Sequence, residues 1–369
     1  GGREDLGLLP SWAASYLLSM DKRAKEATLG TADLAGSWSA HYRDKNTDRP
    51  VSLIDFPYMT VLGIYSDTKN PVTKKFEGFP SCGGTCTSPY MHDSSHQPAF
   101  AYLPYLVTGD YYYLEELQFW TMWNVFSSNP GYRKDIQGLL QPDQVRGQAW
   151  SLRTLAEAAY ITPDSDRLKE HFNRILTSNL DWYSTQYLNG GVGANALGII
   201  TNGPAVVYNN YTGMAPWMDD FFTAALGHTA ELGFTKALPL LKWKATFPIE
   251  RMMGDGACWI AASMYTMTVR DNGSSPIYAT AGQAFAASST DYTKFACASA
   301  EMASLLKLKV GEMVGYATSP LGYPANLQPA LAMAADVGGS RGSAAWAKFA
   351  ARPFKPDYSQ GPQFAIVPR

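Results

Sequence analysis

The sequence predicts an all-α protein: one barrel of about six helix hairpins, with a few short strands in its loops. Three observations support this prediction. Apolar stretches of helical length repeatedly end at a turn rich in Gly, Pro and Asp and restart at once as another helix. Segments with the pattern of strands are few. No low-complexity linker divides the 369 residues, so we expect residues 1–369 to form one domain.

The hairpins are predicted in order along the chain. Asp110, Asp164 and Thr235 each stand at a turn and precede an amphipathic run, which is the pattern of a helix N-cap. A tight turn between two helices makes them antiparallel neighbours. In the fifth hairpin a longer link leads to a second helix near 292–308. The first helices of the hairpins are expected at 8–18, 98–107, 145–161, 221–232, 258–269 and 326–337.

Composition excludes some partners and suggests others. The net charge is −2, and no basic stripe or charged tail is present, so we expect no nucleic acid as a partner. No apolar run has the length of a membrane span. Charged residues make up only 17%, whereas aromatic residues reach 13%, with 22 Tyr and 10 Trp. Flat rings of this kind stack on sugars, although the cores of large helical proteins also need them.

Four cysteines indicate the compartment. Cys82 and Cys86 flank a short Gly-rich loop and could close a small disulfide, and Cys258 and Cys297 could form a second one. Free cysteines are the alternative. Two disulfides suit a secreted or periplasmic protein. The chain begins Gly-Gly-Arg, without a starting Met, so we expect it to be a fragment of a longer protein whose other domains are possible partners.

Polar and aromatic residues gather just before or at the start of the first helix of each hairpin. If the hairpins pack in a ring, all these starts meet at one mouth of the barrel, which predicts a single cleft there. Caps explain the Asp residues individually, but cations are disfavoured at a helix start, so capping explains neither Arg146 nor His92. The stretches are 2–7, 92–98, 143–150, 215–221, 254–259 and 323–328.

Two of these stretches resemble a known group of enzymes. Arg146-Gly147-Gln148-Ala149-Trp150 is similar to the helix start of unsaturated glucuronyl hydrolases, and Trp217-Met218-Asp219-Asp220-Phe221 resembles the element that carries their catalytic Asp. Here the Asp element follows the Arg element, whereas in those enzymes it precedes it. The resemblance to six-hairpin, (α/α)6-toroid carbohydrate-active enzymes implies cleavage of glycosidic bonds in an acidic or decorated polysaccharide.

Glycoside hydrolysis requires a proton donor and a second carboxylate, which indicates the catalytic candidates. We expect Asp219 or Asp220 as one carboxylate and Asp93 or Glu4 as the other. His92 is a candidate general base. The expected substrate-binding residues are polar or aromatic side chains in the same stretches: Arg146, which could hold a uronate, and Gln144, Gln148, His96, Gln97, Trp217, Arg3, Trp259, Tyr323 and Asn326.

Two alternatives to a hydrolase remain. In a polysaccharide lyase, Arg146 or Gln144 would neutralise the uronate, and His92, His96 or a Tyr would abstract the proton. The third possibility is a carbohydrate-binding or structural module without catalysis. His92 and His96 have a spacing that could hold a metal on a helix, but Pro98 argues that the helix starts later. We therefore expect no metal and no other cofactor.

Overall fold

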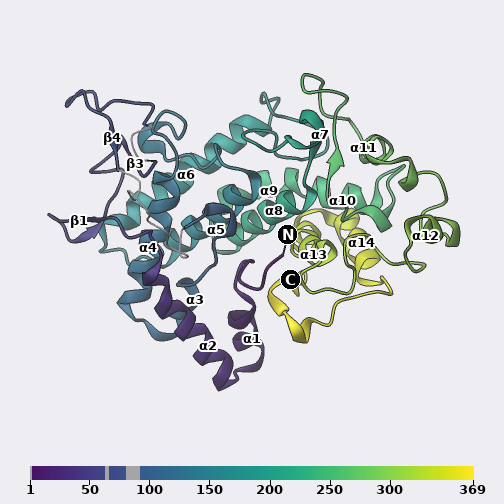
Figure 1. The fold of residues 1–369 in the computed structure, drawn as a ribbon, viewed down its shortest axis with the longest axis horizontal. Helices are drawn as coiled ribbons and strands as arrows, with labels where there is room; N and C mark the ends of the chain where they lie inside the picture. The colour runs from purple at the N-terminus through teal and green to yellow at the C-terminus, as the bar shows by residue number, and fades with distance from the viewer. Residues whose placement is uncertain (1, 63–65, 80–91) are drawn as a thin grey trace, which may run out of the picture.

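The computed structural model describes residues 2–62, 66–79 and 92–369, and helices dominate them (Figure 1). The α-helices are α1 Ser11–Ser19, α2 Lys22–Asp33, α3 Tyr102–Thr108, α4 Tyr111–Phe126, α5 Val145–Ile161, α6 Arg167–Tyr187, α7 Tyr208–Tyr211, α8 Pro216–Glu231, α9 Leu238–Lys244, α10 Thr246–Met253, α11 Ala281–Ser288, α12 Ala300–Leu306, α13 Tyr323–Val337 and α14 Gly339–Ala350. The all-α prediction is confirmed.

Strands are short and lie in the connections, as predicted. They form three two-stranded pairs of two residues per strand. The antiparallel pairs are β1 (Arg43–Asp44) with β2 (Arg49–Pro50) and β5 (Gly213–Met214) with β6 (Met267–Thr268). The parallel pair is β3 (Met59–Thr60) with β4 (Glu77–Gly78).

Consecutive helices pack against each other in pairs: α1 with α2, α3 with α4, α5 with α6, α8 with α9, and α13 with α14. The first members of these pairs coincide with five of the predicted first helices. Asp110 caps α4 by accepting a hydrogen bond of 3.0 Å from the backbone N–H of Tyr112. In α6 the cap is Asp166 rather than Asp164, because Asp166 accepts from the N–H of Leu168.

The first helix predicted for the fifth hairpin, at 258–269, is wrong. This segment contains only the 3-10 helix η5 (Trp259–Ala261) and strand β6. Thr266, Thr268 and Val269 are β-branched and favour extended backbone, and β6 pairs with β5 instead of coiling. In place of the second helix predicted near 292–308, the structure has the shorter helix α12. Cys297, just before the start of α12, is held by a disulfide.

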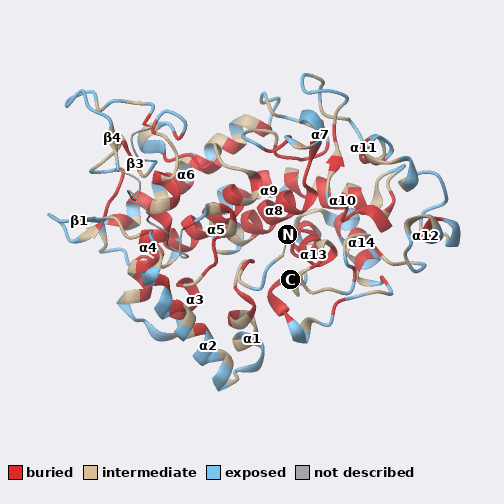
Figure 2. Cartoon of the chain, in the orientation of Figure 1, coloured by how far each residue is buried: buried red, intermediate tan, exposed pale blue. Residues whose placement is uncertain are grey.

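The core lies where α5, α8 and α13 pack side by side, and these helices are buried along most of their length (Figure 2). Trp150 on α5 and Phe221 on α8 meet with ring centroids 4.7 Å apart. At Gly227 an added Cβ would lie 2.4 Å from Cγ of Met333, so a glycine allows α8 to approach α13 closely. Outer segments such as α2 and α12 are more exposed (Figure 2).

The two terminal segments lie next to each other. The side-chain amide of Gln363 donates to the carbonyl of Arg3 over 3.2 Å. Gln363 belongs to the 3-10 helix η8 (Pro362–Phe364), which contacts both α1 and α13. In the described ranges no helix combines the length and apolarity needed to cross a membrane.

One of the two predicted disulfides is present, between Cys258 and Cys297, whose Cα atoms are 5.4 Å apart. Cys82 and Cys86 lie outside the described residues. The bond closes a loop across 39 residues, which contains β6, α11 and the 3-10 helix η6 (Thr290–Tyr292). It therefore ties a segment with little helix of its own to the core.

We expect the double substitution Cys258→Ser and Cys297→Ser to lower the free energy of unfolding by about 2–4 kcal/mol, because the unfolded chain gains the entropy of the opened loop. Urea unfolding of the variant and the parent protein measures this difference. A change below about 0.5 kcal/mol would contradict the expectation, because that is the range of substitutions at neutral surface positions.

Candidate functional site

The starts of α5, α8 and α13 lie together and form a common polar and aromatic surface. The guanidinium of Arg146 lies over the ring of Trp217 at 5.5 Å, and Trp217 lies 6.1 Å from Tyr323 between ring centroids. None of these three helices has a side-chain cap. Their polar residues are therefore not occupied in capping.

Tyrosines extend this surface into an aromatic row, defined here as Tyr208, Trp217, Tyr265, Tyr316 and Tyr323. The ring of Tyr265 is stacked with that of Trp217, with centroids 6.2 Å apart. It lies edge-on to the ring of Tyr323, with centroids 5.5 Å apart. Tyr208 stands edge-on to Tyr265, and Tyr316 lies 6.4 Å from Tyr323. Tyr265 and Tyr316 are 49% and 75% exposed, whereas Trp217 is buried, so tyrosines form the part of the row that solvent reaches.

A 3-10 helix, η2 (Ser94–His96), joins the row to a pair of carboxylates. His96 Nδ1 is hydrogen-bonded to the carboxylate of Asp93, and its Nε2 lies 2.9 Å from a guanidinium nitrogen of Arg146. Gln144 accepts from Nε of Arg146 over 3.0 Å and donates to the hydroxyl of Ser95. The predicted residues Asp93, His96, Gln144 and Arg146 thus form one network.

Beside η2 is a cavity of about 660 Å³ that holds two carboxylates, Asp93 and Asp143. One oxygen of Asp143 accepts from the hydroxyl of Ser94, and the other accepts from the N–H of Gln144 over 2.7 Å. Most of the other polar residues that line the cavity carry hydroxyl groups, and the indole of Trp123 lines it as well. The other lining residues are Ser39, Tyr42, Val61, Leu62, His92, Trp123, Asn124, Ser127, Ser128, Leu139, Leu140, Pro142 and Ser151.

The environments of the two carboxylates move their pKa values in opposite directions. Burial raises the pKa of Asp143 above its ordinary value, against the hydrogen bonds from Ser94 and the N–H of Gln144. Burial also opposes ionisation of Asp93, but the hydrogen bonds from His96 and the N–H of Ser95 outweigh it and lower the pKa of Asp93. Asp143 therefore retains its proton more readily, and Asp93 is the more readily ionised.

His92 lines the same cavity but is poorly suited to act as a base. Its ring lies between two indoles, 3.8 Å from Trp123 and 4.0 Å from Trp120 between centroids. Burial lowers the pKa of His92 to about 3. Neither ring nitrogen has a hydrogen-bond partner among the residues that the structure describes. A base this weak gains little from proton transfer at neutral pH.

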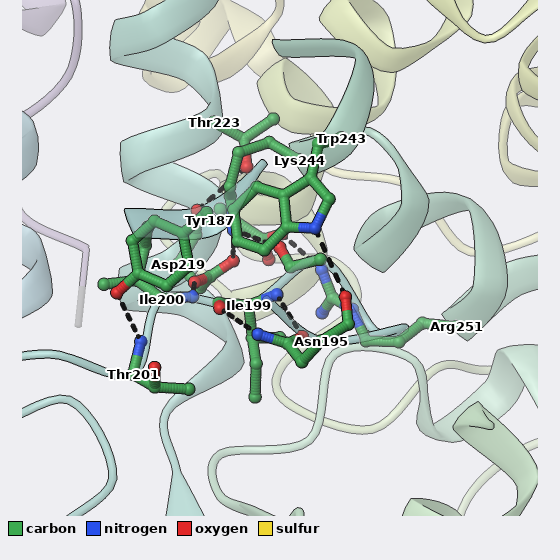
Figure 3. Close-up of polar contacts among 12 residues, drawn as sticks. Tyr187, Asn195, Ile199, Ile200, Thr201, Asp219, Thr223, Trp243, Lys244 and Arg251 are labelled. Carbon is green, nitrogen blue, oxygen red and sulfur yellow. Dashed lines mark hydrogen bonds and ion pairs between the residues drawn. The ribbon is translucent and has the colours of Figure 1, made fainter. Parts of the chain in front are cut away.

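Asp219 (Figure 3) and Asp220, the carboxylates favoured by the sequence, lie in buried ion pairs rather than in this cavity. Asp219 is paired with Lys244 of α9 and accepts from the N–H of Ile200 over 3.1 Å. Asp220 is paired with Arg251 of α10. Both side chains are at most 2% exposed, so they face the helices behind α8 instead of the surface formed by its first turn. Neither carboxylate is open to solvent.

The other predicted residues are distributed between the core and the surface. Glu4 is exposed and outside the cavity, and Arg3 is paired with Asp5 over 2.6 Å. Trp259 packs against the apolar core. The remaining three are fully buried: Gln97 bonds Asn124, Gln148 bonds Tyr183, and both side-chain polar atoms of Asn326 lack a described partner. These side chains do not join the Asp93 network.

Asp143 lies in one of the stretches expected at the cleft, but it was not among the predicted catalytic residues. A Gly four residues later was an available signal. At Gly147 an added Cβ would lie 2.3 Å from Oδ2 of Asp143, so the carboxylate packs over the first turn of α5 where a side chain is absent. Tyr208 and Tyr265 were also missed, because both lie outside the stretches at the starts of the predicted first helices.

The described part of the chain contains no group of three or more His, Cys, Asp and Glu side chains placed to hold a metal ion. The site built from these residues is therefore a pair of carboxylates with a His–Arg network and an aromatic row. Comparisons of the chain with models of protein families, with curated proteins and with solved structures found no match.

Proposed function

We propose that this protein is a glycoside hydrolase that cleaves an acidic or decorated polysaccharide. The observation that carries the proposal is the pair Asp93 and Asp143, which line one cavity and have pKa values moved apart. Carboxyl groups tuned in opposite directions are the arrangement that acid–base cleavage of a glycosidic bond uses.

In the simplest reaction, the carboxyl group of Asp143 gives its proton to the glycosidic oxygen as the bond from that oxygen to the anomeric carbon breaks. The carboxylate of Asp93 removes a proton from the water whose oxygen bonds to the anomeric carbon. His96 positions Asp93 through its Nδ1 hydrogen bond and is itself held by Arg146. The reaction is a hydrolysis, and it consumes one water molecule for each glycosidic bond broken.

The bases that a lyase would need are less suitable. Burial lowers the pKa of His92 to about 3 and raises the pKa of Tyr208 to about 12, so neither group accepts a proton readily near neutral pH. Both ring nitrogens of His96 are already hydrogen-bonded. This favours hydrolysis over β-elimination on the same scaffold.

In this proposal, Arg146 is the residue that gives the site its preference for an acidic sugar. Its hydrogen bonds go to the neutral groups Gln144 and His96, and it forms no ion pair with a described carboxylate. A half-buried guanidinium with donors left over is suited to bidentate binding of a uronate. The adjacent aromatic row supplies ring faces on which neighbouring sugars can stack.

We also propose the (α/α)6-toroid arrangement for the helices. Contacts run from α3 through α4, α5 and α8 to α13, and η8 links α13 with α1. This chain of contacts supports a ring, although the fifth pair lacks a regular first helix. The disulfide supports export to an oxidising compartment, such as the periplasm or the exterior.

We expect Arg146→Met to raise KM for a uronate-containing substrate by about 10–100-fold, the loss expected when a bidentate ion pair to the substrate is removed. KM for a neutral polysaccharide should change little. Steady-state kinetics on a matched acidic and carboxyl-reduced polymer measures both. An equal rise for the two polymers would contradict acid recognition by Arg146.

The activity itself is tested with a panel of acidic and neutral polysaccharides, by following reducing ends and ultraviolet absorbance together. New reducing ends without absorbance support hydrolysis. Absorbance that rises with chain cleavage, from the conjugated double bond of the product, would make the protein a lyase. Binding without cleavage across the panel would leave a carbohydrate-binding module and overturn the enzymatic proposal.

A further inference from the structure

A second cavity, of about 440 Å³, lies away from the carboxylate pair, between α1, the last turns of α8 and the C-terminal segment. Met333 of α13 and Tyr102 of α3 complete its inner wall. None of its lining residues belongs to the first cavity. The proposed hydrolysis makes no use of it.

The wall of this second cavity is mostly apolar. Two features show that it is open to solvent and not sealed inside the core: Leu18 is 75% exposed and Val367 is 61% exposed. At the rim, Arg369 is paired with Glu231. The other apolar lining residues are Leu8, Leu9, Ala14, Leu17, Pro362, Ala365, Ile366 and Pro368.

Two polar side chains interrupt this apolar wall away from the rim, the imidazole of His228 and the amide of Gln363, and His228 is the one held by a buried carboxylate. Its Nε2 lies 3.2 Å from the carboxylate of Glu157 on α5, and its ring meets Tyr102 edge-on at 6.1 Å. The side chain of Glu157 has no exposed surface, and its second oxygen has no hydrogen-bond partner among the described residues. A buried dyad of this kind is costly unless it has a use or a further partner.

The dyad fixes which atoms of a ligand would fit. Glu157 is an acceptor, so in the neutral imidazole the proton sits on Nε2 and Nδ1 is left as an acceptor. No hydrogen bond joins Nδ1 to another described side chain. The carboxylate behind the ring disfavours an anion in the cavity. The buried guanidinium of Arg153, which interacts electrostatically with Glu157, disfavours a second cation.

We propose that this cavity binds a small, neutral, apolar molecule that carries one hydroxyl group. The apolar body packs against the leucines of α1 and the Ile366–Pro368 segment, and the hydroxyl donates to Nδ1 of His228. The volume lies within the range of small-molecule sites, roughly 300–1,000 Å³. This proposal does not depend on the proposed hydrolase activity.

The test is binding of a matched series to the full chain: 2-naphthol, naphthalene and 2-naphthoate, measured by titration calorimetry at neutral pH. We expect 2-naphthol to bind about tenfold more tightly than naphthalene, the worth of one satisfied hydrogen bond, and 2-naphthoate to bind more weakly than both. Equal affinity for all three, or no binding of 2-naphthol up to its solubility, would overturn the proposal.

Variants assign the binding to this cavity. Ala14→Phe places a ring in the cavity from α1 and should abolish binding, whereas Ala27→Phe, an exposed position on α2, should not. His228→Phe should remove the preference for the hydroxyl. His228→Gln should keep it, because an amide can donate to Glu157 and still accept from the ligand. Retention of the hydroxyl preference in His228→Phe would contradict the role of the imidazole.

A second copy of the chain is the competing occupant of an apolar, open cavity. Sedimentation of the parent protein and of Ala14→Phe distinguishes the two. Self-association that is lost in Ala14→Phe would assign the cavity to a chain–chain interface and overturn the proposal. A monomer in both cases, together with the hydroxyl preference, supports the small-molecule site.

Discussion

We expect Asp143→Asn to lower kcat on a polysaccharide about a thousandfold, because the amide cannot give a proton to the leaving oxygen. Asn keeps the shape of the side chain: its oxygen can accept from the N–H of Gln144, and its amide nitrogen can donate to the hydroxyl of Ser94. Asp93→Asn should reduce kcat by a similar factor, since an amide cannot accept the proton of the attacking water.

Leaving-group chemistry separates an acid from a structural residue. An aryl glycoside with an activated phenol needs little protonation, so it should be hydrolysed by Asp143→Asn far better than the polymer is. Asp93→Asn should gain no such advantage. Asp164→Asn is the matched control, because its carboxylate is 99% exposed and outside the cavity. Equal losses on both substrates for Asp143→Asn would contradict its role as the acid.

The pH dependence of the parent enzyme follows from the same two groups. Activity requires Asp93 without its proton, and the lowered pKa of Asp93 allows this down to acidic pH. Activity also requires Asp143 with its proton, and this form is lost as pH rises through the raised pKa of Asp143. We therefore expect a bell-shaped profile of kcat/KM with an acidic optimum. In Asp143→Asn the alkaline limb should disappear.

The largest loss of stability is expected for Lys244→Met, about 3–5 kcal/mol, because it leaves Asp219 buried without its counter-charge. Both side chains of this pair have no exposed surface. The ammonium of Lys244, which lies beside Asp219 in Figure 3, also donates to the carbonyl of Gly198 over 2.8 Å, so the substitution frees two acceptors. Urea unfolding monitored by circular dichroism measures the change.

The double variant Asp219→Leu/Lys244→Met tests the reason for this loss. If the unpaired charge causes it, the double variant should be more stable than Lys244→Met alone, since no charge remains buried. Lys236→Met is the control, because it breaks the exposed pair with Asp181 and should change stability by less than about 1 kcal/mol. Additive losses in the double variant would show that lost packing is responsible.

The helix pairs could be predicted from the sequence because their signals are local. Asp110 caps α4 through an N–H two residues away, and the apolar positions of α5 repeat within single turns. The buried state of Asp219 and Asp220 could not be predicted in this way. Their counter-charges, Lys244 and Arg251, come from α9 and α10, and a predicted hairpin does not show which side chains of its two helices face each other.

The convergence of helix starts was partly predictable. It required only that the first helices of several hairpins run in the same direction, and the contacts of Arg146, Trp217 and Tyr323 agree with this. The stretch 254–259 does not stand at the start of a regular helix as expected, because 258–269 contains only η5 and β6. Pairing of β6 with β5 and the bond from Cys258 to Cys297 are long-range contacts that outweigh its helical pattern.

The paired charges behind α8 also constrain how this sequence can change over evolution. Loss of either member of the pair Asp219 and Lys244 leaves a lone charge with no access to water, so intermediates with one substitution are strongly disfavoured. The same holds for Asp220 and Arg251. Among divergent relatives, we expect positions 219 and 244 to change together, and positions 220 and 251 likewise. The two pairs also interact electrostatically with each other, so a change in one pair should alter the cost of a change in the other.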